Sequence, residues 1–151
     1  MDDTLQSLLD ERNVMRGLSL AARLADQKRY SDLHLVFAED VAFDFGGGGG
    51  GRGIVALRQL MAKFLEVCGG TQHLLGGVLV DVDGDKAKSS VYVQARHQRP
   101  NDPLGPIFDV NGEYRDLWER RSEGWRIVQR EAVWFAHAGD ASILNVPESE
   151  A

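Results

Sequence analysis

Cysteine is almost absent from this sequence of 151 residues, which contains only Cys68. A lone cysteine excludes an internal disulfide framework and a cysteine-rich zinc site. Long hydrophobic runs are also missing, since none approaches the roughly 18–20 residues that span a bilayer. The Met-Asp-Asp start lacks the basic and apolar regions of a signal peptide. We therefore expect a soluble, cytoplasmic protein without a membrane partner.

Positive charge is scarce as well. The chain has 17 Lys and Arg against 23 Asp and Glu, a formal net charge of −6. Nucleic-acid binders concentrate positive charge, so no nucleic-acid partner is expected. The content of 43% hydrophobic and 26% charged residues is typical of globular proteins. A chain of this length fits one domain.

The first half of the chain has helical periodicity. Apolar residues recur at helical spacing over residues 5–25, which predicts an amphipathic helix. A second, short helix is predicted over 31–37 and a third from residue 54, ended by Gly69-Gly70 as by a C-cap. Residues 41–45 alternate weakly and lead into six glycines. This run lacks the Lys-Ser/Thr ending of a phosphate-binding loop and predicts a mobile loop.

From residue 71 the period changes to two. Strands are predicted over 71–82, 87–99, 107–121 and 125–137, separated by turn signals such as Asp83-Gly84. Helices followed by a strand meander indicate an α+β fold. We expect a cone-shaped, curved antiparallel sheet with the N-terminal helices packed over it, enclosing a cavity suited to a small molecule. This domain spans residues 1–140, and 141–151 form a C-terminal tail.

Three titratable residues are candidates for chemistry in that cavity. Asp26 stands where the first helix ends, His73 opens the first long strand, and His97 extends the apolar row of the next strand. An imidazole can accept and return a proton near neutral pH, and a carboxylate can fix its tautomer. The set suits proton abstraction beside a carbonyl, followed by loss of a leaving group. Alternatively, each histidine only bonds a backbone carbonyl.

Other side chains have less definite roles. Aromatic candidates for substrate binding are Tyr30, Phe45, Tyr92, Trp118 and Trp134, although large aromatics in strands also simply fill cores. His34 and His137 lack motif context and are assigned surface or structural roles. Asp26 and the two candidate histidines could as a two-His-one-carboxylate set hold iron or zinc. No helical i, i+4 histidine pair accompanies them, and we expect no metal.

Several motifs carry a family resemblance. Thr71-Gln72-His73 followed by Gly76-Gly77, with His97-Gln98-Arg99 one strand later, resembles scytalone dehydratase. The helix end over 26–33 resembles that enzyme too. The hexachlorocyclohexane dehydrochlorinase family similarly pairs a helix-end Asp with a strand His. Gly124-Trp125-Arg126-Ile127 is similar to the wider SnoaL-like, nuclear-transport-factor-like superfamily.

This resemblance implies a cofactor-independent acid–base lyase or isomerase, dehydratase-like, that uses no metal or organic cofactor. Its substrate would be a cyclic, carbonyl-bearing small molecule, apolar or aromatic. His73 would be the main proton acceptor, Asp26 its orienting partner, and His97 a second donor or acceptor at the leaving oxygen. The two tyrosines that polarise the substrate in scytalone dehydratase align with Ala25 and Phe45, which cannot donate a hydrogen bond. The electrophilic half of that site is therefore missing or rebuilt.

Two other readings stay open. The same fold serves as a noncatalytic binding or accessory module, such as the small subunit of ring-hydroxylating oxygenases, and as a polyketide cyclase. Noncatalytic relatives have no need of an Asp–His pair, so the joint presence of Asp26, His73 and His97 favours an enzyme. A broad sheet with an apolar back face also predicts a homo-oligomer.

Overall fold

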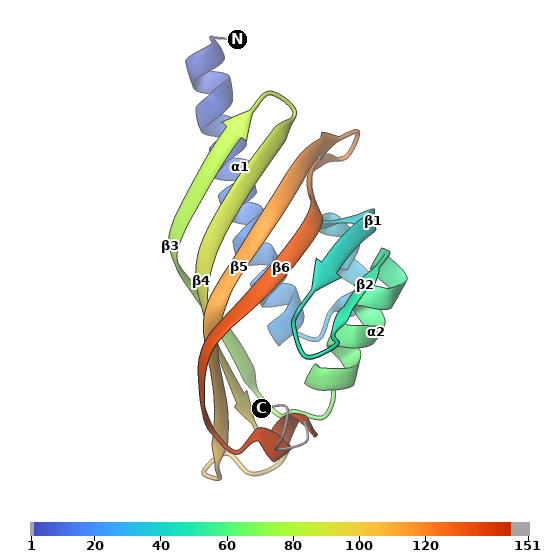
Figure 1. Ribbon diagram of the computed structural model, residues 1–151, viewed down its shortest axis with the longest axis vertical. Helices are drawn as coiled ribbons and strands as arrows, with labels where there is room; N and C mark the ends of the chain where they lie inside the picture. Colours follow the sequence, from blue (N-terminus) through green and yellow to red (C-terminus); the bar gives the residue numbers. More distant parts are fainter. Residues whose placement is uncertain (1, 146–151) are drawn as a thin grey trace.

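The computed structural model describes residues 2–145. Two α-helices, two 3-10 helices (η) and six strands follow one another along the chain (Figure 1). In order they are α1 (Asp3–Asp26), η1 (Tyr30–Leu35), β1 (Phe37–Asp44), β2 (Gly50–Arg52), α2 (Ile54–Leu65), β3 (Thr71–Asp83), β4 (Lys86–Gln98), β5 (Ile107–Arg121), β6 (Gly124–Gly139) and η2 (Ala141–Leu144).

The strands form one curved sheet in the order β2-β1-β6-β5-β4-β3. The four long strands make the predicted antiparallel meander. The sheet as a whole is mixed, because β1 runs parallel to β6, and the expectation of an antiparallel sheet is corrected in this respect. β1 was missed as a full strand because Val36 and Phe37 complete a plausible helical stripe in the sequence. Of its two pairing partners, β6 lies about ninety residues further along the chain and β2 has only three residues.

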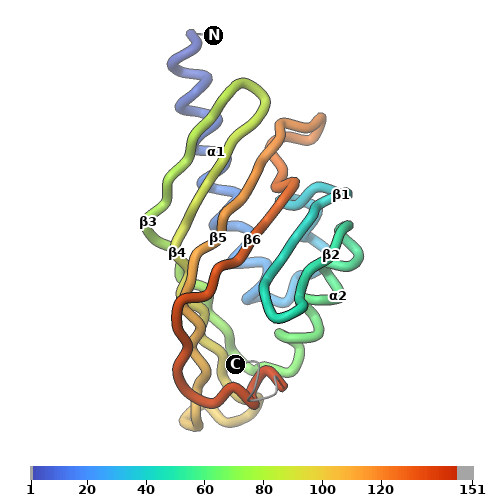
Figure 2. The backbone as a smooth tube through the Cα atoms, in the orientation of Figure 1, coloured from blue at the N-terminus to red at the C-terminus, as the bar shows by residue number. Residues whose placement is uncertain are grey.

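The long helix α1 lies across one face of the sheet, and its first turns extend past the β3–β4 hairpin (Figures 1 and 2). Its buried stripe includes Val14, Leu18 and Leu24, which join the inward side chains of the strands in one core. Gly17 allows a close approach at the centre of this contact, since a Cβ there would lie 2.8 Å from the Trp118 ring. The absence of a side chain at Gly17 therefore lets the helix pack closely on the sheet at Trp118.

A bulge in β3 changes which side chains face inward. Gly76 pairs with Tyr92 and Leu79 with Ser90, so two residues of β3 oppose one of β4. Gly77 adopts a φ of +63°, as the first residue of a glycine bulge does. Leu79 therefore faces outward and is 69% exposed, whereas strict alternation in the sequence places it on the same face as His73.

The connections around α2 differ from the sequence prediction. The second helix is 3-10 and ends at Leu35. Helix α2 ends with Glu66 as its C-cap, not at Gly69-Gly70. Gly69 instead pairs with the backbone of Gln98 at 2.8 Å. A Cβ on it would lie 2.7 Å from the Arg99 carbonyl oxygen, so this position requires a residue without a side chain.

The glycine run is partly ordered into the sheet. Gly46, Gly47 and Gly48 have positive φ values and form the turn. The remaining glycines lead into β2, which pairs antiparallel with β1. The mobility predicted for this loop stays a prediction.

The predicted tail begins with structure. Residues 141–144 form η2, whose Ile143 is buried against Cys68 and Phe108. The rest of the predicted tail, residues 146–151, lies outside the described residues. Among the described residues, no helix is long and apolar enough to cross a membrane.

Candidate active site

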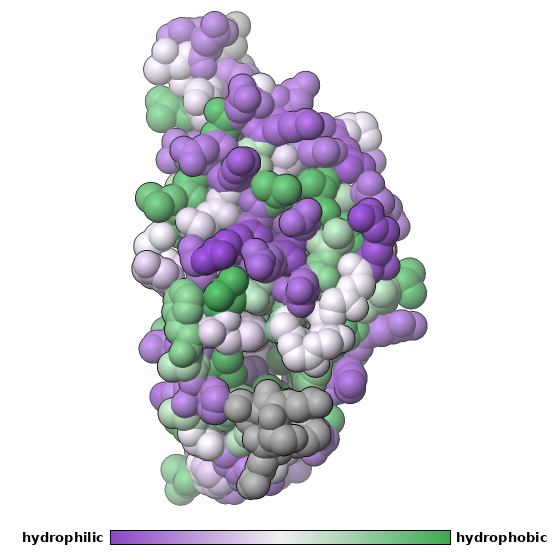
Figure 3. Space-filling model, viewed as in Figure 1, coloured by the Kyte–Doolittle hydropathy of each residue, from purple (hydrophilic) through white to green (hydrophobic). Residues whose placement is uncertain are grey.

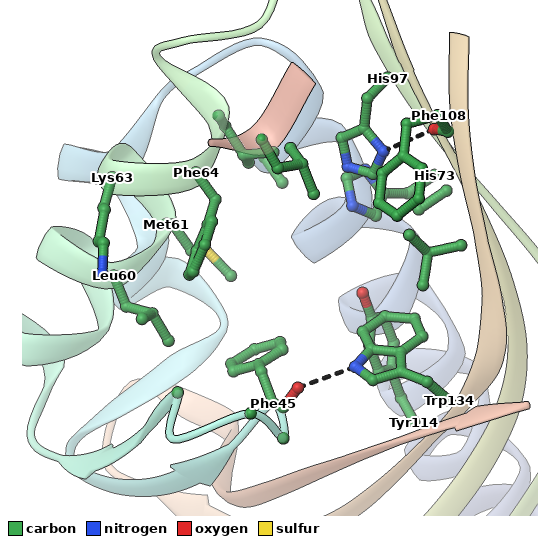
Figure 4. Close-up of a pocket in the computed structure, with 18 of the residues that line it drawn as sticks. Phe45, Leu60, Met61, Lys63, Phe64, His73, His97, Phe108, Tyr114 and Trp134 are labelled. Carbon is green, nitrogen blue, oxygen red and sulfur yellow. Dashed lines mark hydrogen bonds between the residues drawn. The ribbon is translucent and has the colours of Figure 1, made fainter. Parts of the chain in front are cut away.

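A cavity of about 360 Å³ opens where α1 ends and the sheet curves away from it. Side chains from both α-helices, the β1–β2 turn and the four long strands line it. Figure 4 shows the two histidines on one wall and the α2 side chains on the opposite wall. Most of the lining is apolar, including Phe45, Leu60, Met61, Phe64, Phe108 and Trp134. The site therefore holds its few polar groups in a poorly hydrated setting.

Asp26 and His73 form a hydrogen-bonded pair at this cavity. His73 Nδ1 lies 2.6 Å from Asp26 Oδ1, and the His73 backbone N–H donates to Oδ2 at 3.0 Å. Because the carboxylate accepts, Nδ1 carries the hydrogen and the neutral ring keeps its lone pair on Nε2. His73 is one of the residues that line the cavity. The proximity predicted for this pair is what the structure shows, while its catalytic role stays a prediction.

Three donors hold the Asp26 carboxylate. Burial raises its pKa, but the hydrogen bonds from the His73 ring and backbone and from Thr71 outweigh it, so the pKa lies below its ordinary value of 3.8. Thr71 Oγ donates to Oδ1 at 3.0 Å. The carboxylate is thus kept ionised and oriented. Thr71 belongs to the Thr-Gln-His motif, but no role was predicted for it from the sequence.

His97 lies beside His73 on the neighbouring strand. His73 is directly opposite Ala95 in the β3–β4 register, so His97 is its diagonal neighbour on the same face. The two rings meet edge to face, with centroids 6.0 Å apart. His97 is 4% exposed and contributes to the cavity lining, as its predicted place at the end of an apolar row requires.

The protonation state of His97 follows from its contacts. Burial is the main cause that lowers its pKa below 6.5, and the hydrogen bond to the Phe108 carbonyl opposes this only in part. Nδ1 lies 3.0 Å from that carbonyl oxygen and must donate to it. In the neutral ring Nε2 is then an acceptor. His97 therefore suits accepting a hydrogen bond from a substrate hydroxyl better than supplying a proton.

Beneath the cavity lies a buried ion pair that the sequence analysis did not find. Arg130 donates through Nε and Nη2 to the two carboxylate oxygens of Asp116, at 2.8 and 2.7 Å. Both residues are 3% exposed. The guanidinium stacks 4.3 Å from the centre of the Tyr114 ring. Alternation along β5 places Asp116 inward. On β6 the inward residues change from Trp125 and Ile127 to Arg130 at a register shift, so only the pairing of the two strands shows that Arg130 and Asp116 meet.

The five predicted substrate-binding aromatics separate into two groups. Phe45 and Trp134 line the cavity, and the Trp134 indole N–H donates to the Phe45 carbonyl at 2.8 Å. The others lie elsewhere. Tyr92 is 60% exposed on the outer face of the sheet, because β4 alternates and its inward positions are the odd-numbered ones. Trp118 is fully buried in the α1 contact and donates to Ser89 Oγ.

Tyr30 is the third predicted aromatic outside the cavity. It packs against the core at the start of η1, and its hydroxyl is enclosed without a hydrogen-bond partner among the described residues. Conversely, Tyr114 and His137 line the cavity although neither was predicted to do so. No local pattern marks His137, because a register shift separates it from Trp134 on β6; it reaches the cavity through its pairing with Val110 on β5. Among residues 2–145, no group of three or more His, Cys, Asp and Glu is arranged to hold a metal ion.

A long helix under a curved, open sheet, with an internal apolar cavity, defines the class of small α+β proteins that have the NTF2-like fold. Within this class the chain belongs to the SnoaL-like family, whose domain profile matches residues 6–131. An uncharacterized protein of Mycobacterium tuberculosis is 33% identical over 128 residues, which cover 84% of this chain and 86% of that protein.

Solved structures agree on the fold. A provisionally named scytalone dehydratase from Novosphingobium aromaticivorans has a TM-score of 0.80 and 20% identity, covering 89% of this chain and 90% of that one. A hexachlorocyclohexane dehydrochlorinase has a TM-score of 0.74 and 17% identity, with 97% of both chains covered. At these identities the likeness shows a shared fold and leaves the reaction to be argued from the site.

Proposed function

We propose that this protein is a cofactor-independent lyase or isomerase, dehydratase-like, that acts on a cyclic, carbonyl-bearing small molecule in its cavity. The observation that carries the proposal is the Asp26–His73 pair, in which the bonded Nδ1 leaves Nε2 as a base toward the cavity. A general base must stand within hydrogen-bond reach of the proton it removes, and His73 lines the space that a substrate would fill.

The walls support a ring-shaped substrate. Aromatic side chains from four parts of the chain surround the cavity, and its volume of about 360 Å³ lies in the range of small-molecule sites. An apolar or aromatic ring would bury its surface there, while a polar substituent would lie toward the histidines. In this proposal no metal or organic cofactor takes part, because the base and its orienting carboxylate both belong to the chain.

The test is exchange of an acidic carbon-bound proton. The probe is 2-tetralone, a bicyclic ketone, incubated in D₂O and followed by NMR. The wild-type protein should accelerate loss of the proton signals next to the carbonyl, and His73→Gln should remove the acceleration. Asp26→Asn should lower the acceleration as well. Asp81→Asn is its matched control, since Asp81 is exposed on the same strand as His73.

A second candidate function is binding without catalysis, either as an accessory subunit of the ring-hydroxylating oxygenase type or as a carrier. The bond from His97 to a backbone carbonyl favours it, because that contact is what a purely structural histidine makes. A polyketide cyclase would use the same acid–base groups as the lyase. Tight binding of ring compounds by the wild-type protein, with no proton exchange or turnover on a panel of cyclic ketones, would establish binding and contradict the lyase.

We also propose that the chain forms a homo-oligomer through the outer face of the sheet. Leu74, Leu79, Tyr92 and Phe135 are each more than half exposed there. Tyr92 and Phe135 pack edge to face, with ring centroids 6.4 Å apart. Figure 3 shows this face, where apolar side chains lie among hydrophilic ones. Light scattering after size exclusion should give a mass above 16.7 kDa for the wild type and a smaller one for Tyr92→Lys; a monomeric wild type would refute this.

A further inference from the structure

Removing a proton beside a carbonyl moves negative charge onto the carbonyl oxygen, and a hydrogen-bond donor aimed at that oxygen lowers the barrier. The Asp26–His73 pair supplies the base but not this donor. All three tyrosines of the chain lie within residues 2–145, and only Tyr114 lines the cavity. Its hydroxyl is thus the one phenolic donor available to a bound molecule.

The Tyr114 hydroxyl points into the cavity, toward the wall that carries the two histidines (Figure 4). It makes no hydrogen bond to any described residue. Among the described residues, the polar side-chain atoms that are both fully enclosed and without a partner belong to Tyr30 and Asn111, so the Tyr114 oxygen is not fully enclosed. The oxygen therefore borders the open space of the cavity. A polar group placed there without a protein partner is free to bond a ligand.

The ring that carries this hydroxyl is held on several sides. Phe45 and Trp134 contact it edge to face, with centroids 6.2 and 6.0 Å away. The Arg130 guanidinium lies 4.3 Å from its centre and is itself fixed by Asp116. A donor fixed in this way does not have to reorganise when charge develops on the ligand.

Burial also keeps the hydroxyl protonated. It raises the pKa of Tyr114 to about 12, and Asp116 and Asp26 act in the same direction, while Arg130 opposes them. At neutral pH Tyr114 therefore remains a donor.

We propose that Tyr114 is a catalytic residue, whose hydroxyl donates a hydrogen bond to the carbonyl or enolate oxygen of a ring-shaped ligand. In this ligand the carbon next to the carbonyl carries the proton that is removed. This inference rests on the proposed function for its catalytic part, and it assigns the orientation of the substrate. The oxygen faces Tyr114 on β5, and the acidic carbon faces His73 on β3.

The step balances within the site. His73 Nε2 takes the proton, the C–H electron pair forms the C=C bond of the enolate, and the C=O π pair moves to the oxygen bonded to Tyr114. When the C=O bond re-forms in a ligand with a conjugated C=C bond, the proton on His73 goes to the far carbon of that system, and the result is an isomerisation. In a ligand with a hydroxyl on the carbon beyond the acidic one, the enolate π pair instead becomes a new C=C bond, the C–O bond to that hydroxyl breaks, and the leaving oxygen takes the proton from His73 to give water. Neither outcome consumes an oxidant, a reductant or another reactant.

Binding of 2-naphthol and naphthalene tests the contact directly, because 2-naphthol is a flat analogue of the 2-tetralone enol and naphthalene lacks its oxygen. The wild type should bind 2-naphthol more tightly than naphthalene. Tyr114→Phe should reduce 2-naphthol affinity about tenfold, the size of a hydrogen bond to a polarised oxygen, and leave naphthalene affinity unchanged. Tyr92→Phe, on the outer face, is the matched control and should change neither.

Two results would overturn the contact: equal affinity of Tyr114→Phe and wild type for 2-naphthol, or no preference of the wild type for 2-naphthol over naphthalene. Thermal unfolding of Tyr114→Phe checks that the fold is kept. The exchange assay separates this inference from the proposed function. There Tyr114→Phe should lower the rate about 10²–10³-fold. Full exchange in Tyr114→Phe, lost in His73→Gln, would refute a catalytic role of Tyr114 while the lyase stands. Tyr114-dependent naphthol binding without any exchange would refute the lyase and with it the catalytic part of this inference, while the contact between Tyr114 and the ligand oxygen stands.

Discussion

His73 binds both carboxylate oxygens of Asp26, one through its ring Nδ1 at 2.6 Å and the other through its own backbone N–H at 3.0 Å. Asp26 is the last residue of α1, and His73 is the third residue of β3. The same contact therefore joins the helix to the sheet and fixes the imidazole that faces the cavity. A substitution at Asp26 or His73 can therefore affect both folding stability and catalysis, and each variant needs a measurement of both.

Replacing Asp26 with Asn should remove the fixed tautomer of His73 while keeping the side chain's size. Loss of a positioned base typically lowers rates about 10²–10⁴-fold, and we expect a loss of that order in 2-tetralone exchange. Ligand affinity should change much less, because the cavity walls are unaffected. Exchange within a few-fold of the wild type, in a variant with normal thermal unfolding, would show that Asp26 does not orient the base.

Replacing His97 with Asn should change how stability depends on pH. The folded-state pKa of His97 lies below 6.5. Between that pKa and the pKa of the unfolded chain, His97 therefore binds a proton in the unfolded state but not in the folded state. The stability that the neutral His97 contributes is therefore present above pH 6.5 and is lost as the pH falls through the folded-state pKa. Urea unfolding between pH 7.5 and 5 should show a shallower decline in the variant; an unchanged slope would contradict the buried, neutral ring.

The Asp116→Asn variant should be strongly destabilised. It leaves the Arg130 guanidinium buried without its counter-charge, and breaking a buried pair typically costs about 3–5 kcal/mol. Asp109→Asn is the matched control, since Asp109 binds Arg96 with the same two-point geometry at an exposed site on the same strand. The control should unfold close to the wild-type denaturant midpoint. Equal losses of unfolding free energy in both variants would mean that burial does not make the Arg130–Asp116 pair more costly to break than an exposed pair.

Gly17→Ala should destabilise the protein although alanine is the better helix former by about 1 kcal/mol. The added Cβ would lie 2.8 Å from the Trp118 ring, which is buried and cannot move aside cheaply. We expect a net loss of about 1–3 kcal/mol in the free energy of unfolding. In a Trp118→Phe background the same substitution should cost less, and a double-mutant cycle without coupling would refute the contact.

The sequence revealed most of the framework because local patterns decide it. The 3.6-residue period of α1 and the alternation of the long strands place these elements within a few residues of their observed bounds. β1 was not predicted as a strand because its first residues continue a helical stripe and its long partner strand, β6, is distant in sequence. The bulge at Gly77 also broke the alternation on which the face of Leu79 was assigned.

The candidate site was likewise predictable from the sequence only in part. By itself the sequence determined that Asp26, His73 and His97 occupy a helix end and two inward strand positions, because periodicity fixes the face of each side chain. Only the tertiary structure decided which groups share one cavity. It brought in Tyr114, His137 and Arg130, which Asp116 holds from outside the cavity lining, and it left out Tyr30, Tyr92 and Trp118. The physical reason is that the curvature and register of the sheet set distances between strands, and these depend on pairings across the whole chain rather than on any local run of residues.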